Sequence, residues 1–435
     1  MIKPRPQFNH QALLSQTRNE LEKVVSSNPG QYNIKTIDCL MSAVAVFSLK
    51  YPSLLQFDKS RREDLRLSHN LKTLYGVERA PCDTQMRERL DGLPLSILDN
   101  VFKSLFSTLQ RSKELERWKF LNQYYLVSLD GTQFFSSEKV HCDYCCEKIY
   151  NKGTDKEYKN YNHQIVVGAI VNSRMKQVLP ICFEPIIRSD GATKNDCERN
   201  ASKRWLQNFR RDHPQLPTVI VGDGLSSNGP FIKELLAHRC KYILVAKDKD
   251  HKNLCEYFWA GEGSDIFEFT EAVAGVQKRY RYMKNVPLND THPDILVTVV
   301  YYEQIDKKGK MTKWIWVTNL EITEGNFKNI VEGGRARWKI ENETFNTLKN
   351  QGYNFEHNYG HGNKTLSNLM AGLMLLAFLI DQCLEAFNVL FQFVLNKNNS
   401  KQITWQKVRS ALFWFQIESW EKLYCAILDP PIATL

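Results

Sequence analysis

The sequence predicts a mixed α/β protein in which a strand-rich core lies between helical regions at both ends. Short apolar runs rich in β-branched residues begin at residue 124 and alternate with amphipathic segments up to residue 246. A second series of strand-like runs fills residues 264–320, and the flanking segments have the three- and four-residue apolar spacing of helices. The 435 residues, 43% of them hydrophobic, are enough for two or three domains with a substantial core.

These changes of pattern divide the chain into five regions. They are 1–120, helical and a predicted DNA-binding region; 121–260, the first part of the core; 261–320, a mostly β insertion; 321–390, the second part of the core; and 391–435, a C-terminal helical region. The first region has 19 Lys and Arg against 13 Asp and Glu, which is more than half of the net charge of +10. Excess positive charge favours a polyanion such as DNA, because neutralised phosphates release counterions. A helical domain with a solvated basic face explains the same excess equally well.

The elements follow in order along the chain. In the N-terminal region, Leu93–Thr108 has helical apolar spacing, and Asp83 and Thr84 are typical of a helix start before Gln85–Leu90. The core is predicted to contain strands at Tyr124–Leu129, His163–Val171, Gln177–Glu184, Thr218–Val221 and Tyr242–Ala246, with helices at Asn195–Arg211 and Gly229–His238. The insertion is predicted to contain strands at Asp265–Thr270, Lys278–Met283, Ile295–Tyr302 and Met311–Thr318. Helices are predicted next at Gly334–Lys349 and Thr365–Phe387.

Membrane insertion and export are not expected. The longest apolar run, Leu369–Ile380, has twelve residues, whereas a membrane span needs roughly 20, so a buried helix is predicted. Met1–Gln11 is polar and lacks the apolar stretch of an export signal. The eleven cysteines are therefore expected to be reduced thiols in a cytoplasmic protein.

Two aspartates share one setting. Asp130 and Asp223 each follow an apolar strand directly and precede a glycine. Open α/β sheets bind ligands at the carboxyl ends of their strands, and two carboxylates there repel each other unless a cation lies between them. Mg²⁺ suits such a site because it prefers carboxylate oxygens and keeps positions open for phosphate. Since Asp-Gly is also a common turn dipeptide, a pair of simple turns remains the alternative.

A third acid is expected from the helix that follows the insertion. Arg337 and Glu341 are four residues apart and so lie on one helix face, with Lys349 further along. Glu341 is the predicted third acid, and Glu343 is the alternative. An exposed Arg337–Glu341 ion pair without catalytic function explains the spacing as well.

Several motifs together resemble a known family. They are Asp83-Thr-Gln-Met-Arg87, Leu129-Asp130-Gly-Thr, Asp196-Cys-Glu-Arg-Asn-Ala201, Gly222-Asp223-Gly-Leu, the Arg337-Trp-Lys-Ile-Glu341 helix and Glu356-His-Asn-Tyr-Gly-His361. From about residue 75 to 390 the chain resembles the cut-and-paste DDE transposases of bacterial insertion sequences, including their β insertion. The signature of that subgroup is Tyr, two residues, Arg, three residues, Glu, six residues, Lys. Here Gly334 stands at the Tyr position, and Lys349 comes one residue late.

The resemblance implies a ribonuclease H-like catalytic core with an inserted β unit, and metal-dependent DNA cleavage and strand transfer at the ends of an insertion sequence. The residues it implies for catalysis and Mg²⁺ binding are Asp130, Asp223 and Glu341; those for DNA contact are Arg337, Trp338 and Lys349. Mn²⁺ is expected to substitute for Mg²⁺. The implied partners are the transposon terminal repeats and target DNA, bound by a homodimer at the nucleoid. Two alternatives stay open: a ribonuclease H-like nuclease without strand transfer, and a catalytically retired transposase that only binds DNA.

A second metal is suggested by His141-Cys-Asp-Tyr-Cys-Cys146. Cys142 and Cys145 have Cys-x-x-Cys spacing, and His163 follows on a predicted strand. A structural Zn²⁺ site needs four such ligands, and no second Cys-x-x-Cys pair stands at a typical distance. A polar loop with reduced thiols is therefore the alternative to a zinc site.

Three further features have two interpretations each. His357 and His361 lie in a Gly-rich loop. One interpretation is that they contact DNA or the active site; the other is that they are solvated loop residues. Trp314 or Trp316 stacks on an unpaired base, or both pack within the sheet. The acidic segment Asp190–Glu198 approaches the active site, or is a loop that caps a helix.

Overall fold

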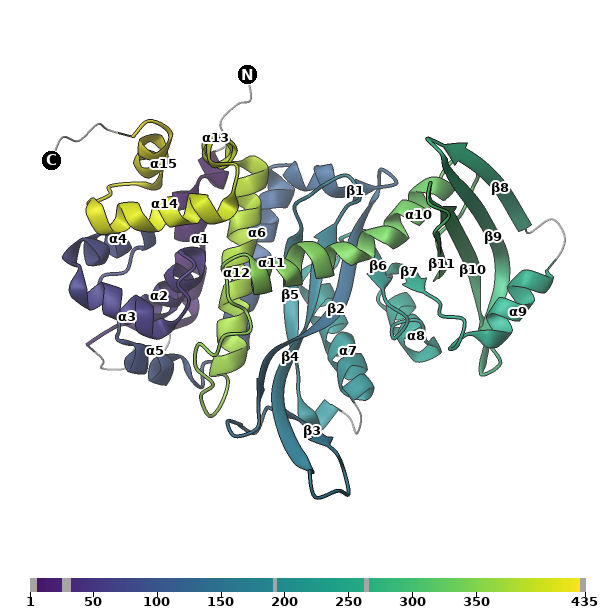
Figure 1. Cartoon of the computed structure of the whole chain (residues 1–435), viewed down its shortest axis with the longest axis horizontal. Coiled ribbons are helices and arrows are strands. Elements are labelled where there is room, and N and C mark those ends of the chain that lie inside the picture. Colours follow the sequence, from purple (N-terminus) through teal and green to yellow (C-terminus); the bar gives the residue numbers. More distant parts are fainter. Residues whose placement is uncertain (1–5, 26–32, 191–193, 262–265, 431–435) are drawn as a thin grey trace.

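The computed structural model describes residues 6–25, 33–190, 194–261 and 266–430, and every statement below refers to these ranges. Parts of Met1–Gln11 and of Asp190–Glu198, and the first residue of the predicted strand Asp265–Thr270, lie outside them. The molecule is elongated (Figure 1), with helices at one end, a strand-rich centre and a β unit at the other end. The mixed α/β class with flanking helices is therefore confirmed.

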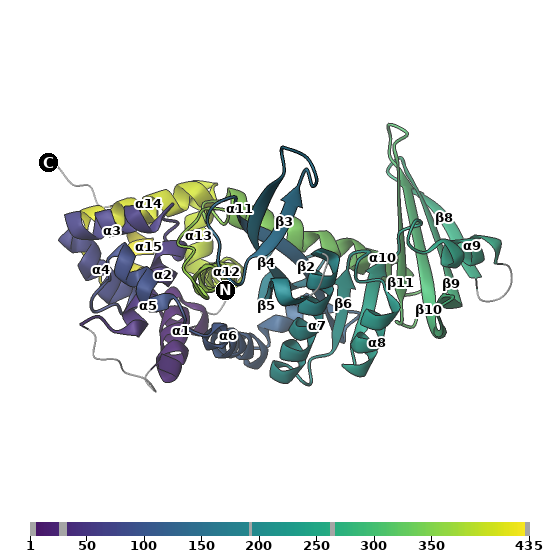
Figure 2. The ribbon, with the colours of Figure 1, turned by 90° about the horizontal axis from the view of Figure 1, so that it is seen from below.

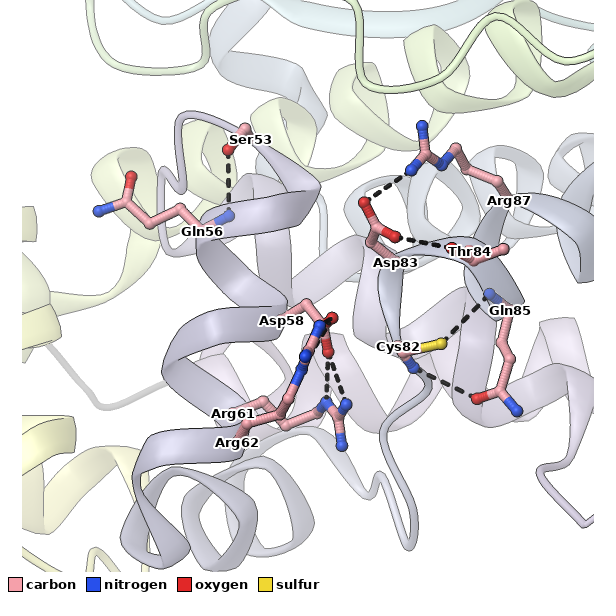
Figure 3. A network of polar contacts seen from close by, with 10 residues as sticks. All are labelled: Ser53, Gln56, Asp58, Arg61, Arg62, Cys82, Asp83, Thr84, Gln85 and Arg87. Carbon is pink, nitrogen blue, oxygen red and sulfur yellow. Dashed lines mark hydrogen bonds and ion pairs between the residues drawn. The ribbon is translucent and has the colours of Figure 1, made fainter.

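The N-terminal region is helical. Its α-helices are α1 (His10–Val25), α2 (Thr36–Ser48), α3 (Leu54–Glu63), α4 (Leu65–Tyr75), α5 (Asp83–Leu90) and α6 (Asp99–Arg111). The predicted helix start is confirmed, since α5 begins at Asp83 (Figure 3). Its cap is reciprocal: the Gln85 backbone N–H donates to Cys82 Sγ, and the Cys82 backbone N–H donates to Gln85 Oε1. Arg61 and Arg62 pair with the buried Asp58, so part of the basic charge of this region is neutralised locally.

The C-terminal helices pack against this N-terminal region, although the two are at opposite ends of the chain. They are α13 (Val389–Asn398), α14 (Lys401–Trp414) and α15 (Trp420–Leu428). The Asn70 side chain donates to the carbonyls of Leu412 and Phe415, at 2.9 Å each. His10 stacks on Trp420 with ring centroids 3.6 Å apart. The two ends of the chain thus form one helical unit, visible in both views (Figures 1 and 2).

Helix α12 (Leu366–Phe387) joins this helical unit to the sheet. By length and composition it could cross a membrane, yet 94% of its most apolar window is buried inside the protein. It packs against α2 on one side and against strand β5 (Leu179–Ile186) on another. A buried ion pair between Lys50 and Asp381 at 2.5 Å adds a polar link to α2. This burial agrees with the core helix predicted from the sequence.

The central sheet contains the strands predicted for the core. They are β2 (Tyr124–Ser137), β4 (Tyr158–Val171), β5, β6 (Thr218–Gly222) and β7 (Lys241–Val245), with the short β1 (Lys119–Phe120) and β3 (Cys146–Tyr150) at the margins. Their order is β5-β4-β2-β6-β7. The pairs β5–β4 and β4–β2 are antiparallel, whereas β2–β6 and β6–β7 are parallel. The connecting helices are α7 (Lys194–Asp212), α8 (Gly229–Ala237) and, after β7, α9 (Lys252–Ala260).

The insertion is an antiparallel meander that extends the same sheet. Its strands are β8 (Ile266–Val273), β9 (Val276–Asn289), β10 (His292–Ile305) and β11 (Met311–Thr318). All four are at the predicted positions, and the first three are longer than predicted. Strand β11 pairs antiparallel with β7, with Trp316 opposite Val245, so the meander continues the core sheet.

Opposite faces of the sheet are covered by different segments. On one face, Trp205 of α7 packs on Gly168 of β4, where an added Cβ would lie 1.9 Å from the indole ring. On the other face, the Ser128 hydroxyl donates to the Arg337 carbonyl at 3.0 Å. Side chains alternate along a strand, so Asp130 lies on the same face as Ser128. That face is crossed by the segment that follows the insertion (Figure 1).

The helix predicted over Gly334–Lys349 lies within a continuous helical segment of residues 327–350, but this segment is not one regular α-helix. The segment consists of α10 (Phe327–Arg335), a 3₁₀ turn (Ala336–Trp338), a π-helix (Ile340–Phe345) and α11 (Asn346–Asn350). Gly334 lies against the Trp316 ring, where an added Cβ would be 2.6 Å from it. This close packing places the helix change directly over the sheet. A π turn closes i→i+5 hydrogen bonds and holds one residue more than an α turn, a geometry frequent at functional sites.

Candidate active site

Asp130 and Asp223 are brought together by the pairing of β2 with β6. The parallel register sets Ser128 opposite Val221, so the same register continued by two residues sets Asp130 beside Asp223. Neighbouring strands lie about 4.8 Å apart, so the two carboxylates leave the sheet side by side. Both side chains line one cleft of about 570 Å³, where β6 ends beside the middle of β2. Asp130 lies within β2, whereas the sequence had predicted that it follows the end of that strand.

Glu341 reaches the same place from the π-helix. Arg337 links it to the sheet, because the same guanidinium nitrogen contacts Glu341 Oε1 at 2.8 Å and Asp130 Oδ2 at 3.5 Å. Arg337 is 6% exposed, so this is a buried bridge and not the exposed ion pair that the spacing alone also allowed. Glu341, and not Glu343, is the glutamate whose charge acts on Asp130.

The electrostatics of Asp130 follow from this crowding. The pKa of Asp130 is raised from its ordinary value to about 7: burial is the largest cause, the charges of Glu341 and Asp223 add to it, and Arg337 opposes them. The negative charge of the three carboxylates is therefore only partly balanced by the positive charge of Arg337. Three carboxylates without a sulfur or imidazole donor are the ligands that a hard divalent cation such as Mg²⁺ prefers. The residues present thus fit the cation expected from the sequence.

Asp223 is held by the backbone that follows it. Its Oδ1 accepts the backbone N–H groups of Leu225 and Ser226, at 2.9 and 3.4 Å. This turn fixes the orientation of the carboxyl group at the strand end. Asp223 can therefore form the Asp-Gly turn and belong to the acidic site at once, because only its Oδ1 atom accepts the hydrogen bonds of the turn.

Glu198 is a fourth acid in the cleft, on the first turns of α7. Its carboxyl group lies against Gly131, where an added Cβ would be 2.9 Å from it. Glu198 lines the cleft with Asp130 and Asp223, and Lys247 lies on the opposite side over Gly224. The acidic segment Asp190–Glu198 thus approaches the site through its last residue. The sequence signal for this was the glycine after Asp130, which leaves room for a side chain to pass.

The three residues expected to contact DNA have different surroundings. Arg337 is buried between the acids, as described above. Trp338 is 47% exposed, and the Arg337 guanidinium lies 4.4 Å from its ring centre. Lys349 pairs with Glu356 at 2.8 Å and, among the described residues, makes no recorded contact with the acids.

The tryptophans of the insertion pack within the sheet. Trp316 is buried, and Trp314 is half-buried with its ring parallel to that of Trp316. Arg335 lies 5.1 Å above the Trp314 ring. The packing interpretation therefore accounts for Trp316, which has no face open to a nucleotide base.

Away from the acids, Cys142, Cys145 and His163 lie close together, as the zinc hypothesis requires, and His361 joins them. His361 comes from the Gly-rich loop between α11 and α12, which the sequence had not connected with the cysteines. His357 of the same loop is exposed and contacts Tyr359.

The region that contains the acidic cluster matches a known protein family. The family model described as the transposase DDE domain matches residues 125–379, which is more than half of the chain. The match begins at β2 and ends within α12, so it contains Asp130, Asp223 and Glu341. No curated protein matches the chain. Among solved structures, the cryo-EM structure of a piggyBac transposase synaptic complex with hairpin DNA aligns with 98% of this chain and 81% of that chain, at 9% identity and a TM-score of 0.40.

Proposed function

We propose, because the chain belongs to the transposase DDE domain family, that it is a cut-and-paste transposase of an insertion sequence. It cleaves DNA at the ends of the element and joins these ends to target DNA. The observation that carries the proposal is the meeting of Asp130, in the middle of β2, with Asp223, just after the end of the parallel strand β6, and with Glu341 of the π-helix. Nothing in a purely structural role requires three carboxylates at one partly exposed place.

The order of the strands supports a ribonuclease H-like core. Three antiparallel strands, β2, β4 and β5, are followed by a helix and by two strands parallel to β2. The first acid stands on the first of these strands, and the second acid follows the fourth. The meander β8–β11 then stands between the core and the segment with the third acid, as a β insertion.

The proposed chemistry is in-line attack on a phosphodiester. Asp130, Asp223 and Glu341 would hold Mg²⁺, with Mn²⁺ as a substitute, and the bound metal activates the attacking hydroxyl and stabilises the leaving oxygen. Arg337 holds the carboxylates of Asp130 and Glu341 in place through its two contacts. Lys247, exposed at the rim of the cleft, adds positive charge where the equatorial phosphate oxygens gain negative charge.

The proposed partners are the terminal repeats of the element and the target DNA. The basic N-terminal region is the proposed surface for the terminal repeats, because most of the net charge lies there. Two ends have to be joined in one reaction, so a homodimer that presents two active sites is part of the proposal.

The test is a cleavage and joining assay with Mg²⁺ and DNA taken from the two flanks of the gene. The wild type is expected to nick this DNA and to join precleaved ends to a target plasmid. Asp130→Asn and Asp223→Asn should lose both reactions while they keep their circular dichroism spectrum and DNA affinity. Nicking by Asp130→Asn at the wild-type rate would refute the site. Nicking without any joining by the wild type would indicate a nuclease instead of a transposase.

A further inference from the structure

Four metal-binding side chains meet in a second cluster, on the β2–β4 hairpin. Cys142 and Cys145 lie in the loop between β2 and β3, His163 is on β4, and His361 lies in the loop between α11 and α12. One ligand atom of each residue lies within 4.8 Å of those of the other three. His163 and His361 are 198 residues apart in the chain, so only the tertiary fold brings them together.

Five of the six separations between these atoms are close to those of a tetrahedron around one zinc ion, and the sixth, between Cys142 and His361, is at most 4.8 Å. Zn–S bonds of about 2.3 Å and Zn–N bonds of about 2.0–2.1 Å give edges of about 3.8 Å for S···S, 3.3 Å for N···N and 3.6 Å for S···N. The two Sγ atoms are 3.9 Å apart, and the two Nε2 atoms are 3.2 Å apart. The S···N separations are 3.5 Å for Cys142–His163, 3.4 Å for Cys145–His163 and 3.2 Å for Cys145–His361.

The surroundings of the cluster are those of a closed site. Cys145, His163 and His361 are buried, and Phe135 packs against His361 with ring centroids 4.7 Å apart. His361 Nδ1 lies 2.9 Å from the Gly362 carbonyl, to which it can donate a proton. That hydrogen bond leaves the Nε2 lone pair of His361 directed at the other three ligands, as is usual for metal-binding histidines.

We propose that Cys142, Cys145, His163 and His361 bind one structural Zn²⁺ ion. Two thiolates and two neutral imidazoles form a complete Cys₂His₂ ligand set without an open position for substrate. A disulfide does not explain the arrangement, because the sulfur atoms are 3.9 Å apart, far from the bonded distance of about 2.05 Å. His163 pairs with Phe135, five residues beyond Asp130 on β2, which puts the zinc about 15 Å from the acids.

The zinc would fix the loop after the π-helix to the sheet. His361 stands between α11 and α12, and the other three ligands belong to the extended β2–β4 hairpin. The ion therefore connects the segment that carries Glu341 with the strand that carries Asp130. This role concerns folding and position, and it is independent of the proposed DNA chemistry.

The test measures metal in the full-length chain, expressed with added zinc and purified without a histidine tag, under reducing conditions. Mass spectrometry of the metal content should find one zinc per chain. Cys145→Ser and His361→Asn should lose it, whereas the neighbouring controls Cys146→Ser and His357→Asn should keep it. Asp130→Asn should also keep it, which separates this site from the acids. Equal zinc in wild type and Cys145→Ser, or wild-type protein without zinc, would overturn the proposal.

A second measurement covers the case in which the ligand variants do not fold. Wild-type protein loaded with Co²⁺ in place of zinc should show the intense visible bands of a tetrahedral site and a thiolate charge-transfer band. Titration of the thiols with an organomercurial should release one metal ion per chain into a chelating indicator. A cobalt spectrum without thiolate absorption, or a Cys142–Cys145 disulfide detected by peptide mass spectrometry, would contradict the assignment.

Discussion

The acidic cluster and the zinc cluster are built on the same two parts of the chain, yet their chemistry differs. The acidic cluster combines Asp130 of β2 and Asp223 after β6 with the π-helix that follows the insertion. The zinc cluster combines the extended β2–β4 hairpin with the loop between α11 and α12. The acidic cluster has only carboxylate oxygens, which prefer Mg²⁺, whereas the other has sulfur and imidazole nitrogen, which prefer Zn²⁺. With both ions bound as proposed, the fold would separate them by ligand type and not by distance alone.

Exposure separates the two sites as well. The Glu341 side chain is 36% exposed and lines the open side of the sheet edge, whereas His163 is 1% exposed. An open site can admit DNA but leaves its charges uncompensated without a cation, as the raised pKa of Asp130 indicates. A closed site has no open position for substrate and can only support the fold. Loss of a ligand should therefore abolish activity at the first site and reduce stability at the second.

The largest expected effect distinguishes the two neighbouring glutamates. Glu341→Gln should lower the rate of DNA cleavage by at least about 10²-fold, because it removes one of the three carboxylates proposed to hold the catalytic metal. Glu343→Gln, two residues away, is the matched control and should cleave at nearly the wild-type rate. Zinc content should stay at one ion per chain in both. A larger loss with Glu343→Gln would transfer the role of the third acid to Glu343.

Arg337 allows the coupling between sheet and π-helix to be tested. Arg337→Gln removes the bridge between Asp130 and Glu341 and leaves two carboxylates without their buried counter-charge. We expect the free energy of unfolding without metal to fall by roughly 1–3 kcal/mol, as measured by urea denaturation. Mg²⁺ should restore part of this loss. Arg335→Gln, whose guanidinium lies over Trp314, is the control that should not change the response to Mg²⁺.

The pH dependence follows from Asp130. Its pKa of about 7 in the folded chain exceeds that of the unfolded chain, so metal-free stability is lost as the pH rises from about 4 through 7. Mg²⁺ binds the ionised carboxyl, so the rise in melting temperature caused by Mg²⁺ should grow between about pH 6 and 8. Asp130→Asn should flatten both trends, and Asp248→Asn, outside the cluster, should not. A wild-type response to Mg²⁺ independent of pH would contradict this account.

The local parts of the acidic site were predictable from the sequence. Asp130 and Asp223 each follow a short apolar run typical of a strand, and this pattern is short-range, although β2 continues past Asp130 to Ser137. The order of strands and helices then implied that the two strands are neighbours. The sequence favoured Glu341 over Glu343 as the third acid, but it gave no sign of the π-helix Ile340–Phe345 from which Glu341 reaches the sheet. A π turn holds one residue more than an α turn, and Lys349 comes one residue later than the family signature places its lysine.

The long-range parts could not be predicted. The strands of the insertion follow from local alternation, but the pairing of β11 with β7 depends on register across the fold. His361 was visible only as a histidine in a Gly-rich loop, 216 residues from Cys145. A Cys-x-x-Cys pair identifies half of a zinc site, and the other half can come from anywhere in the chain. For this reason the sequence left the zinc hypothesis with three ligands.

The smallest expected effect belongs to Trp338, the exposed aromatic residue beside the open site. Its ring contacts Arg337, and an exposed cation–π contact contributes about 0.5–1 kcal/mol, so Trp338→Ala should lower stability by no more than that. If its free face meets DNA, affinity for terminal-repeat DNA in a fluorescence anisotropy assay should fall several-fold. Trp414→Ala, which changes a still more exposed tryptophan on the far helical unit, is the control. Equal DNA affinity in both variants would mean that Trp338 covers Arg337 but does not contact DNA.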